Sequence, residues 1–258
     1  MLTFIRRSFY LLLLAAAGIA RVPAQDHLSI AAAANLVYAL DPLNAEFGRT
    51  HPGIKVTRSI GASGSLVAQI ENGAPYDVFL SADMTYAQKL VQAGGGEAAS
   101  LRPFAIGRLV LWTTRPGLAI DSVAALVRDP SVHRLAIANP RTAPYGFAAQ
   151  EVLARLQLTE TAQPKLVQGE NISQTAEFVE TGNADAGFVA LSLVLASATK
   201  NRGRWLEVPA ELYSPLTQAA LITRQGRDNP AARAYLEFLT SPAAQAIFKQ
   251  FGYASPKP

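Results

Sequence analysis

The chain contains no cysteine among its 258 residues. Disulfide bonds, thiolate metal sites and thiol catalysis are therefore excluded, although an exported protein could have used disulfides. Histidine is also scarce. His27 stands near the start of the expected mature chain, His51 in a Pro-Gly turn and His133 in a charged loop. None of these positions suits a base beside a nucleophile, so the sequence argues against a secreted hydrolase and predicts no enzymatic activity.

The chain also lacks a cluster of charge of either sign. Its formal net charge is +4, and Arg6, Arg7 and Arg21 stand in an acid-free stretch at the N-terminus. Without that stretch the chain has 20 basic and 19 acidic residues, a formal charge of +1. Basic residues are scattered, so the sequence gives no indication of binding to nucleic acid or to an anionic membrane surface.

The first 24 residues have the pattern of a secretory signal peptide. Arg6 and Arg7 form a positive start, residues 9–19 are apolar, and residues 22–24 fit a small-residue cleavage site. The apolar run is too short for a membrane span. We therefore predict that residues 1–24 are a cleaved signal peptide and that the mature protein is free in the periplasm. An uncleaved anchor is the alternative, and the general and twin-arginine export routes both stay open.

Apolar runs alternate with helical patterns along the rest of the chain. Runs at 27–34, 54–60 and 78–80 predict buried strands with a helix between each pair. This βαβαβ order is typical of a mostly parallel sheet with helices on its faces. A second series of the same kind follows, with strands expected at 106–112, 135–138, 165–167, 184–189 and 205–208.

An apolar strand at 216–223 and two closing helices have no partners in the second series. We therefore predict two α/β lobes between which the chain crosses twice, near 104–112 and near 209–220. Two crossings make a hinge, and a ligand is expected between the lobes. The predicted division is residues 25–106 for the first part of lobe 1, 107–210 for lobe 2, and 211–258 for the return to lobe 1.

Four turns share the position between a strand end and a helix start, near Asn35, Ser63, Tyr145 and Ile172. A helix start leaves backbone N–H groups unpaired and carries partial positive charge. In open α/β sheets, ligands bind at the carboxyl ends of the strands. Asn35 is expected to be an N-cap with its side chain facing outward. Two turns lie in each lobe, so together they predict a site for a small anion.

None of these turns carries an obligatory charge, and the nearest basic residue, Arg141, is expected to be an exposed loop residue. Thr142 is expected to cap the helix that begins at Pro144. A site built only from donors suits an anion without a proton. A protonated oxyanion needs an acceptor, because an unmatched buried O–H costs about 1–3 kcal/mol.

Residues 72–83, NGAPYDVFLSAD, resemble the GAPADLFISAD signature of periplasmic molybdate-binding proteins, the substrate receptors of molybdate ABC importers. Further similar stretches follow the family's order at 31–36, 61–66, 140–146 and 243–253. The resemblance implies the type II periplasmic-binding-protein fold, with molybdate or tungstate bound between the lobes. It also implies an ABC permease as partner, a monomer, no cofactor, and no directly bound metal, because molybdenum enters as the oxyanion.

Carried over by position, the family's ligand contacts fall on Asn35 with the backbone of Ala34, on Ser63, on the backbone of Tyr145 and on the N–H of Ile172. Many members have serine at the place of Asn35, although asparagine occurs in some. Many also have a tyrosine at the place of Ala190. We expect either that the Tyr145 hydroxyl replaces the one missing at Ala190, or that the coordination differs.

Two other receptor functions stay open at this point. A sulfate receptor would differ mainly in cavity size, because sulfate is the smaller anion. A ferric-iron receptor would need paired tyrosines with histidine or carboxylate ligands at the cleft. Tyr76 and Tyr86 are expected instead to be packing or surface residues.

Overall fold

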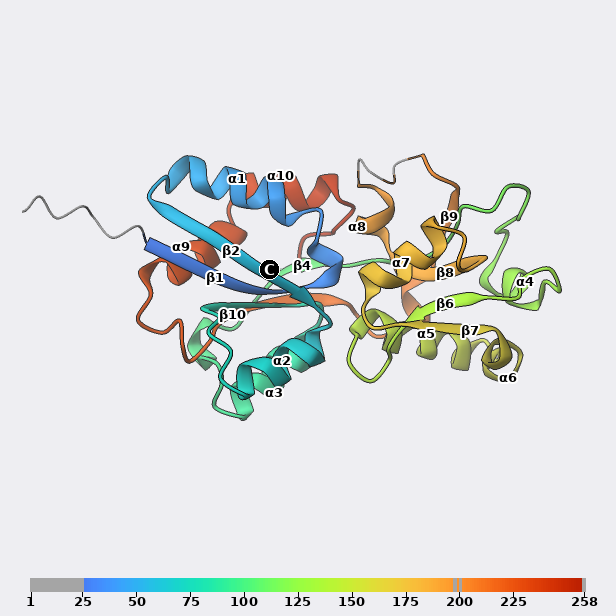
Figure 1. Ribbon diagram of the computed structural model, residues 1–258, viewed down its shortest axis with the longest axis horizontal. Coiled ribbons are helices and arrows are strands. Elements are labelled where there is room, and N and C mark those ends of the chain that lie inside the picture. Colours follow the sequence, from blue (N-terminus) through green and yellow to red (C-terminus); the bar gives the residue numbers. More distant parts are fainter. Residues whose placement is uncertain (1–25, 197–198, 200, 257–258) are drawn as a thin grey trace, which may run out of the picture.

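The computed structural model describes residues 26–196, 199 and 201–256, so the predicted signal peptide lies outside the described residues. Figure 1 shows two α/β lobes side by side. Each is built on a five-stranded mixed sheet, which confirms the predicted two-lobed α/β fold. None of the described helices is both long and apolar enough to cross a membrane.

The sheet of lobe 1 has the strand order β2-β1-β3-β10-β4. β1 runs parallel to β2 and β3, whereas β10 runs antiparallel to β3 and β4. The strands are β1 (Asp26–Ala33), β2 (Ile54–Gly61), β3 (Val78–Ser81), β4 (Arg102–Ile106) and β10 (Thr217–Ile222). The helices are η1 (Ala34–Leu36), α1 (Leu40–Thr50), α2 (Ser63–Glu71), α3 (Met84–Gln92), η2 (Ala98–Ser100), α9 (Pro230–Leu239) and α10 (Pro242–Gln250).

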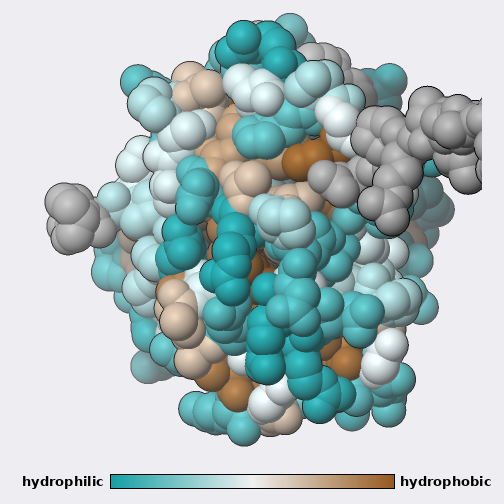
Figure 2. All heavy atoms as spheres, turned by 90° about the vertical axis from the view of Figure 1, so that its left-hand side faces the viewer, coloured by the Kyte–Doolittle hydropathy of each residue, from teal (hydrophilic) through white to brown (hydrophobic). Residues whose placement is uncertain are grey.

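Helices cover both faces of this sheet, so its central strands are apolar on both sides. Leu28 and Ile30 of β1 pack into the cluster that includes residues of α1, α9 and α10. Ala31, which points to the opposite face, packs into the cluster that includes residues of α2 and α3. The outer end of lobe 1 is mostly hydrophilic (Figure 2).

The sheet of lobe 2 has the order β7-β6-β8-β5-β9, with β6 parallel to β7 and β8, and β5 antiparallel to β8 and β9. Its strands are β5 (Leu109–Thr113), β6 (Leu135–Ala138), β7 (Leu166–Gly169), β8 (Ala186–Ala190) and β9 (Arg204–Glu207). Its helices are α4 (Val123–Arg128), α5 (Pro144–Arg155), α6 (Thr159–Ala162), η3 (Gln163–Lys165), α7 (Ile172–Glu180), α8 (Leu191–Val194) and η4 (Ala210–Leu212).

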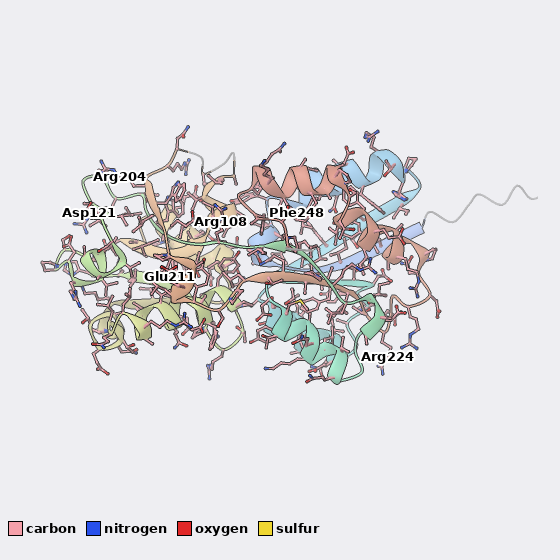
Figure 3. The ribbon with its side chains drawn as sticks, turned by 180° about the vertical axis from the view of Figure 1, so that it is seen from behind. Arg108, Asp121, Arg204, Glu211, Arg224 and Phe248 are labelled. Carbon is pink, nitrogen blue, oxygen red and sulfur yellow. The ribbon has the colours of Figure 1, made fainter. Side chains whose placement is uncertain are left out.

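The single strand predicted over residues 106–112 is wrong. β4 ends at Ile106 in one sheet and β5 begins at Leu109 in the other. Gly107 and Arg108 join them, and Arg108 lies between the lobes in Figure 3. Phe104 and Ala105 of β4 and all of β5 are buried. The apolar pattern therefore continues through the predicted crossing near 104–112 and does not reveal that two separate strands meet there.

The chain returns to lobe 1 through residues 213–216, which with 107–108 are called the hinge below. The two hinge segments are paired, because the N–H of Gly107 donates to the carbonyl of Leu216 at 2.9 Å. The exact lobe boundaries at 106/107 and 210/211 stay predictions.

Phe147 of α5 lies off the buried face of its helix, and the residue is 51% exposed. The buried stripe of α5 follows Ala148, Ala149, Val152 and Leu153. Phe147 precedes that stripe by one residue, which is about 100° around the helix axis.

Candidate anion-binding site

A small cavity lies between the lobes, and all five residues predicted from the sequence line it. Lobe 1 contributes Ala33, Ala34, Asn35, Gly61, Ala62, Ser63 and Ala82, and lobe 2 contributes Ala143, Pro144, Tyr145 and Ile172. The space open to the centre of a water molecule is about 10 Å³, which corresponds to a sphere of roughly 2.7 Å radius once a water radius of about 1.4 Å is added. This size suits a small inorganic anion better than a sugar or an amino acid.

Two residues of the cavity wall at the starts of α5 and α7 have free N–H groups. In α5, Pro144 has no N–H, and the N–H groups of Gly146 and Phe147 both reach the carbonyl of Ala143. Only the N–H of Tyr145 is left in that turn without a partner among the described residues.

In α7 the Asn171 side chain caps the N–H groups of Ser173 and Gln174, at 2.9 and 3.1 Å. The N–H of Ile172 is therefore the free group of that turn within the described chain. Such a group at a helix start is a donor for an anion.

The Ser63 side chain is fully buried at the first position of α2. Its Oγ accepts a hydrogen bond from the N–H of Ala82 at 3.0 Å, so its own proton remains available to a ligand in the cavity. The N–H of Ser63 also has no carbonyl partner among the described residues. Ser63 thus offers two donors from one position.

Hydrogen bonds between the lobes hold the cavity closed. The N–H of Gly64 donates to the carbonyl of Thr142 at 2.8 Å, and the Tyr86 hydroxyl donates to the carbonyl of Arg141 at 2.7 Å. A third bond between the lobes runs from Ser192 Oγ, which donates to the carbonyl of Asn35 at 2.8 Å. The residues of lobe 1 and lobe 2 that line the cavity are therefore in contact around it.

The Thr142 cap is a wrong prediction. The N-cap of α5 is Ala143, and no side chain caps it. Pro144 at the first helical position has no N–H, so the helix start has one fewer donor for a side chain to cap. The carbonyl of Thr142 accepts from the N–H of Gly64.

The outward-facing Asn35 cap is also wrong. α1 begins only at Leu40, and Asn35 lies inside η1 with 1% of its surface exposed. Its Nδ2 donates to Gln218 Oε1 at 2.7 Å and to Tyr253 Oη at 2.8 Å. Both amide protons are used, so only the backbone N–H of Asn35 is left to offer an anion.

Gln218 and Tyr253 are the residues of this site that the sequence reasoning missed. Gln218 Nε2 donates to the carbonyls of Ala82 and Leu216, at 2.9 and 3.0 Å, which leaves Oε1 for Asn35. A β-bulge follows Gln218 in its pairing with β4, and bulges re-aim side chains near functional sites. A lone glutamine in the apolar run of residues 216–223 is the signal that could have indicated it.

No charged residue is among the described residues that line the cavity. Arg141 is exposed, as predicted, and lies outside the lining. The positive ends of α2, α5 and α7 therefore provide the electrostatic attraction for an anion. Asp83, which follows the lining residue Ala82, caps the start of α3, and burial raises the pKa of its carboxyl.

The residues invoked for other functions lie elsewhere. The Tyr76 hydroxyl donates to Gln69 and the Tyr86 hydroxyl to the Arg141 carbonyl, and neither residue lines the cavity. The described part of the chain holds no group of three metal-ligating side chains and no histidine in the cavity wall. Ala190 is buried outside that wall.

Known proteins match this chain over nearly its whole length. The family described as bacterial extracellular solute-binding protein matches residues 28–254. The molybdate-binding protein ModA of Azotobacter vinelandii is 44% identical over 238 residues, which cover 92% of this chain and 94% of that protein. ModA of Rhodobacter capsulatus is 41% identical over 238 residues, 92% of each chain.

Solved structures agree with this match. The periplasmic molybdate-binding protein of Azotobacter vinelandii has a TM-score of 0.83 at 37% identity, covering 89% of this chain and all of that one. The sulfate-binding protein SubI of Mycobacterium tuberculosis has a TM-score of 0.73 at 16% identity, covering 90% of this chain and 88% of that one. The second likeness concerns the fold alone.

Proposed function

The chain belongs to the bacterial extracellular solute-binding protein family, and on that premise we propose that it is a periplasmic receptor that binds molybdate or tungstate between its lobes. It would act as a monomer, free of its signal peptide, and deliver the anion to an ABC permease. The observation that carries the proposal is a small uncharged cavity whose wall includes residues with free donors from both lobes.

The relatives named for molybdate support the choice of anion, because they match more than nine-tenths of this chain and of their own length. The proposed donors are the Ser63 hydroxyl and the N–H groups of Asn35, Ser63, Tyr145 and Ile172, with Ala34 completing the wall. Hydrogen bonds to a charged acceptor are about twice as strong as neutral ones. Four tetrahedral oxygens without protons can each accept from such donors.

The donors come from both lobes, and this explains how binding would close the receptor. In an open form each lobe offers only part of the set, so the anion binds the closed form more tightly and shifts the population toward it. The absence of a cation from the described cavity wall also leaves no ion pair to break on release. A receptor that must hand over its ligand benefits from both properties.

Isothermal titration calorimetry on residues 25–258 with molybdate, tungstate, sulfate and phosphate tests the proposal. We expect molybdate and tungstate to bind at least 100-fold more tightly than sulfate or phosphate. Tight sulfate binding would identify a receptor for another oxyanion, with the same cavity and a different selectivity. Failure of all four anions to bind would contradict the proposal.

A further inference from the structure

Two buried side-chain atoms have no hydrogen-bond partner in the part of the chain that the structure describes, Asn35 Oδ1 and Tyr145 Oη. Each residue is 1% exposed, and both line the cavity, Asn35 from lobe 1 and Tyr145 from lobe 2. Buried polar atoms are nearly always paired, because an orphan atom loses its hydration without compensation. An orphan acceptor and an orphan donor in one cavity wall therefore indicate a function.

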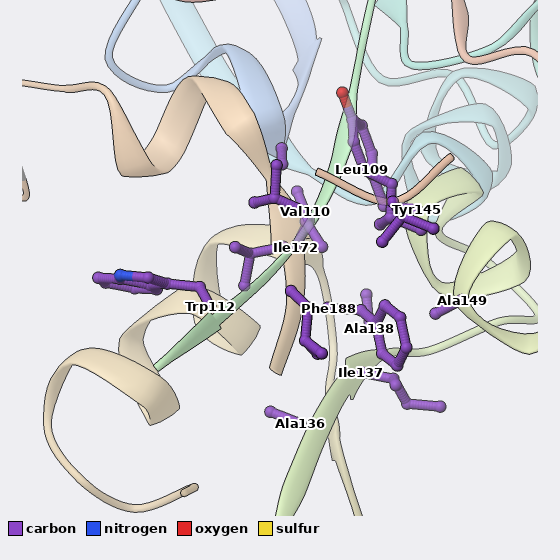
Figure 4. Close-up of a cluster of buried hydrophobic side chains, with 14 of the residues drawn as sticks. Leu109, Val110, Trp112, Ala136, Ile137, Ala138, Tyr145, Ala149, Ile172 and Phe188 are labelled. Carbon is purple, nitrogen blue, oxygen red and sulfur yellow. The ribbon is translucent and has the colours of Figure 1, made fainter. Parts of the chain in front are cut away.

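Both orphan atoms belong to the cluster around Gln218 at the hinge. Asn35 Nδ2 donates to Gln218 Oε1 at 2.7 Å. Tyr145 Oη lies close to the Gln218 side chain beside Gly107. A Cβ atom built on Gly107 would be 2.1 Å from Tyr145 Oη and 3.0 Å from Gln218 Nε2, so both groups approach the same position. Figure 4 shows the Tyr145 hydroxyl at the far end of its side chain, away from Phe188 and Trp112 in the core of lobe 2.

Tyr253 lies in the same cluster. Its hydroxyl accepts from Asn35 Nδ2 at 2.8 Å and donates to the Asn35 carbonyl at 2.9 Å. Burial first, and then the proximity of the Tyr253 and Tyr213 hydroxyls, raise the pKa of Tyr145 well above its usual range. Tyr145 is therefore a neutral phenol with a proton to donate at any physiological pH.

The other hydrogen-bonding groups of the cluster are already used. The amide protons of Asn35 go to Gln218 and Tyr253, and those of Gln218 go to the carbonyls of Ala82 and Leu216. The Tyr253 proton goes to the Asn35 carbonyl. Tyr145 Oη and Asn35 Oδ1 are thus the two buried side-chain atoms of the described residues that have no partner at all, and they are a possible donor and an acceptor.

We propose that these two groups form a clasp between the lobes, in which the Tyr145 hydroxyl donates to Asn35 Oδ1 when the anion is bound. The inference rests on the proposed function, because the N–H groups of the same two residues are among the proposed anion donors. An anion that binds both N–H groups draws the residues together, and the side chains then pair behind it. The clasp positions both donors and slows reopening of the lobes.

Tyr145→Phe tests the clasp because it removes one oxygen atom and keeps the buried ring. We expect a molybdate Kd about 10-fold higher than that of the wild type, with the increase in koff and an unchanged kon in stopped-flow measurements. The thermal midpoint of the anion-free variant stays equal or rises, because only an orphan hydroxyl is lost. A hydroxyl with a purely structural role would lower that midpoint and leave koff unchanged.

Tyr235→Phe is the matched control. Tyr235 is a fully buried tyrosine of lobe 1, and its hydroxyl donates to Asn44 Oδ1 at 2.8 Å, away from the cavity lining. This variant lowers the thermal midpoint and leaves the molybdate koff unchanged. The contrast separates the loss of any buried hydroxyl from the loss of this one.

A double-mutant cycle with Asn35→Ser identifies the acceptor. Serine removes Oδ1, so Tyr145→Phe has no further effect on koff in that background if the two atoms are partners. Wild-type binding with an unchanged koff in Tyr145→Phe, or an undiminished effect in the Asn35→Ser background, would overturn the clasp alone. A wild-type protein that binds none of the four oxyanions would overturn the proposed function, and the clasp with it.

Discussion

Replacing Ser63 by alanine separates two roles of one hydroxyl group. In the structure Ser63 Oγ accepts from the N–H of Ala82 at 3.0 Å, and its proton is free to donate to the anion. Ser63→Ala removes both interactions. The bond to the anion exists only in the loaded protein, so its loss weakens the affinity for molybdate. The bond to Ala82 does not need the ligand, so its loss lowers the stability of the unliganded protein.

The expected size of each effect follows from the partner involved. A hydrogen bond to a charged group contributes about 1.5–3 kcal/mol, which raises the molybdate Kd by roughly 10- to 150-fold. The N–H of Ala82, left buried and unpaired, costs about 1–3 kcal/mol of unfolding free energy. For a chain of this length that lowers the thermal midpoint by roughly 2–12 °C.

Calorimetric titration with molybdate and thermal unfolding without ligand measure the two effects independently. Ser65→Ala is the matched control, because Ser65 lies two residues further along the same helix start with an exposed side chain. It should change neither quantity appreciably. A Ser63→Ala variant with a lower midpoint and an unchanged Kd would show that the hydroxyl serves the fold and not the anion.

Two further changes test the closed form and its electrostatics. Gly64→Ala places a Cβ 2.7 Å from the ring of Tyr86, whose hydroxyl bonds to the Arg141 carbonyl of the other lobe. The ring must move, so we expect a molybdate Kd at least 10-fold higher, together with a lower unliganded midpoint because Gly64 and Tyr86 share lobe 1. An unchanged Kd in calorimetry would contradict this account of closure. Asp83→Asn keeps a side-chain oxygen to cap the Tyr86 N–H and removes a carboxylate whose pKa is raised by burial. A raised pKa means that the charged form of Asp83 destabilises the folded state, so the variant should have a higher thermal midpoint at pH 7. This gain in midpoint should vanish below about pH 4, where the carboxyl is protonated in the unfolded state as well. A gain in midpoint that persists at pH 3 would refute this cause.

The backbone part of the candidate site could be predicted from local sequence. Ser63, Tyr145 and Ile172 each follow a strand and open a helix, and strand ends of parallel sheets meet at one edge. The structure brings these turns together around one cavity, with Asn35 and Ala34 beside them. Local patterns are sufficient here because helix starts always leave N–H groups free.

The side-chain part could not be predicted in the same way. The partner of Asn35 is Gln218, 183 residues away in the sequence, and their contact depends on the return of β10 into the first sheet. The crossing near 104–112 could be predicted, but its division into two strands around Gly107 could not, since the residues before and after it are mostly apolar. Hydrophobic periodicity reports burial, and it carries no information about which sheet buries a residue.

The central claim is that one oxyanion occupies the cavity between Ser63 and Tyr145, and crystals grown with molybdate would test it most directly. X-ray data collected at the molybdenum absorption edge locate the metal by its anomalous signal. We predict one strong peak in this cavity, with oxygen atoms within hydrogen-bond distance of Ser63 Oγ and of the N–H groups of Tyr145 and Ile172. A peak elsewhere, or closed lobes around an empty cavity in saturating molybdate, would contradict the account.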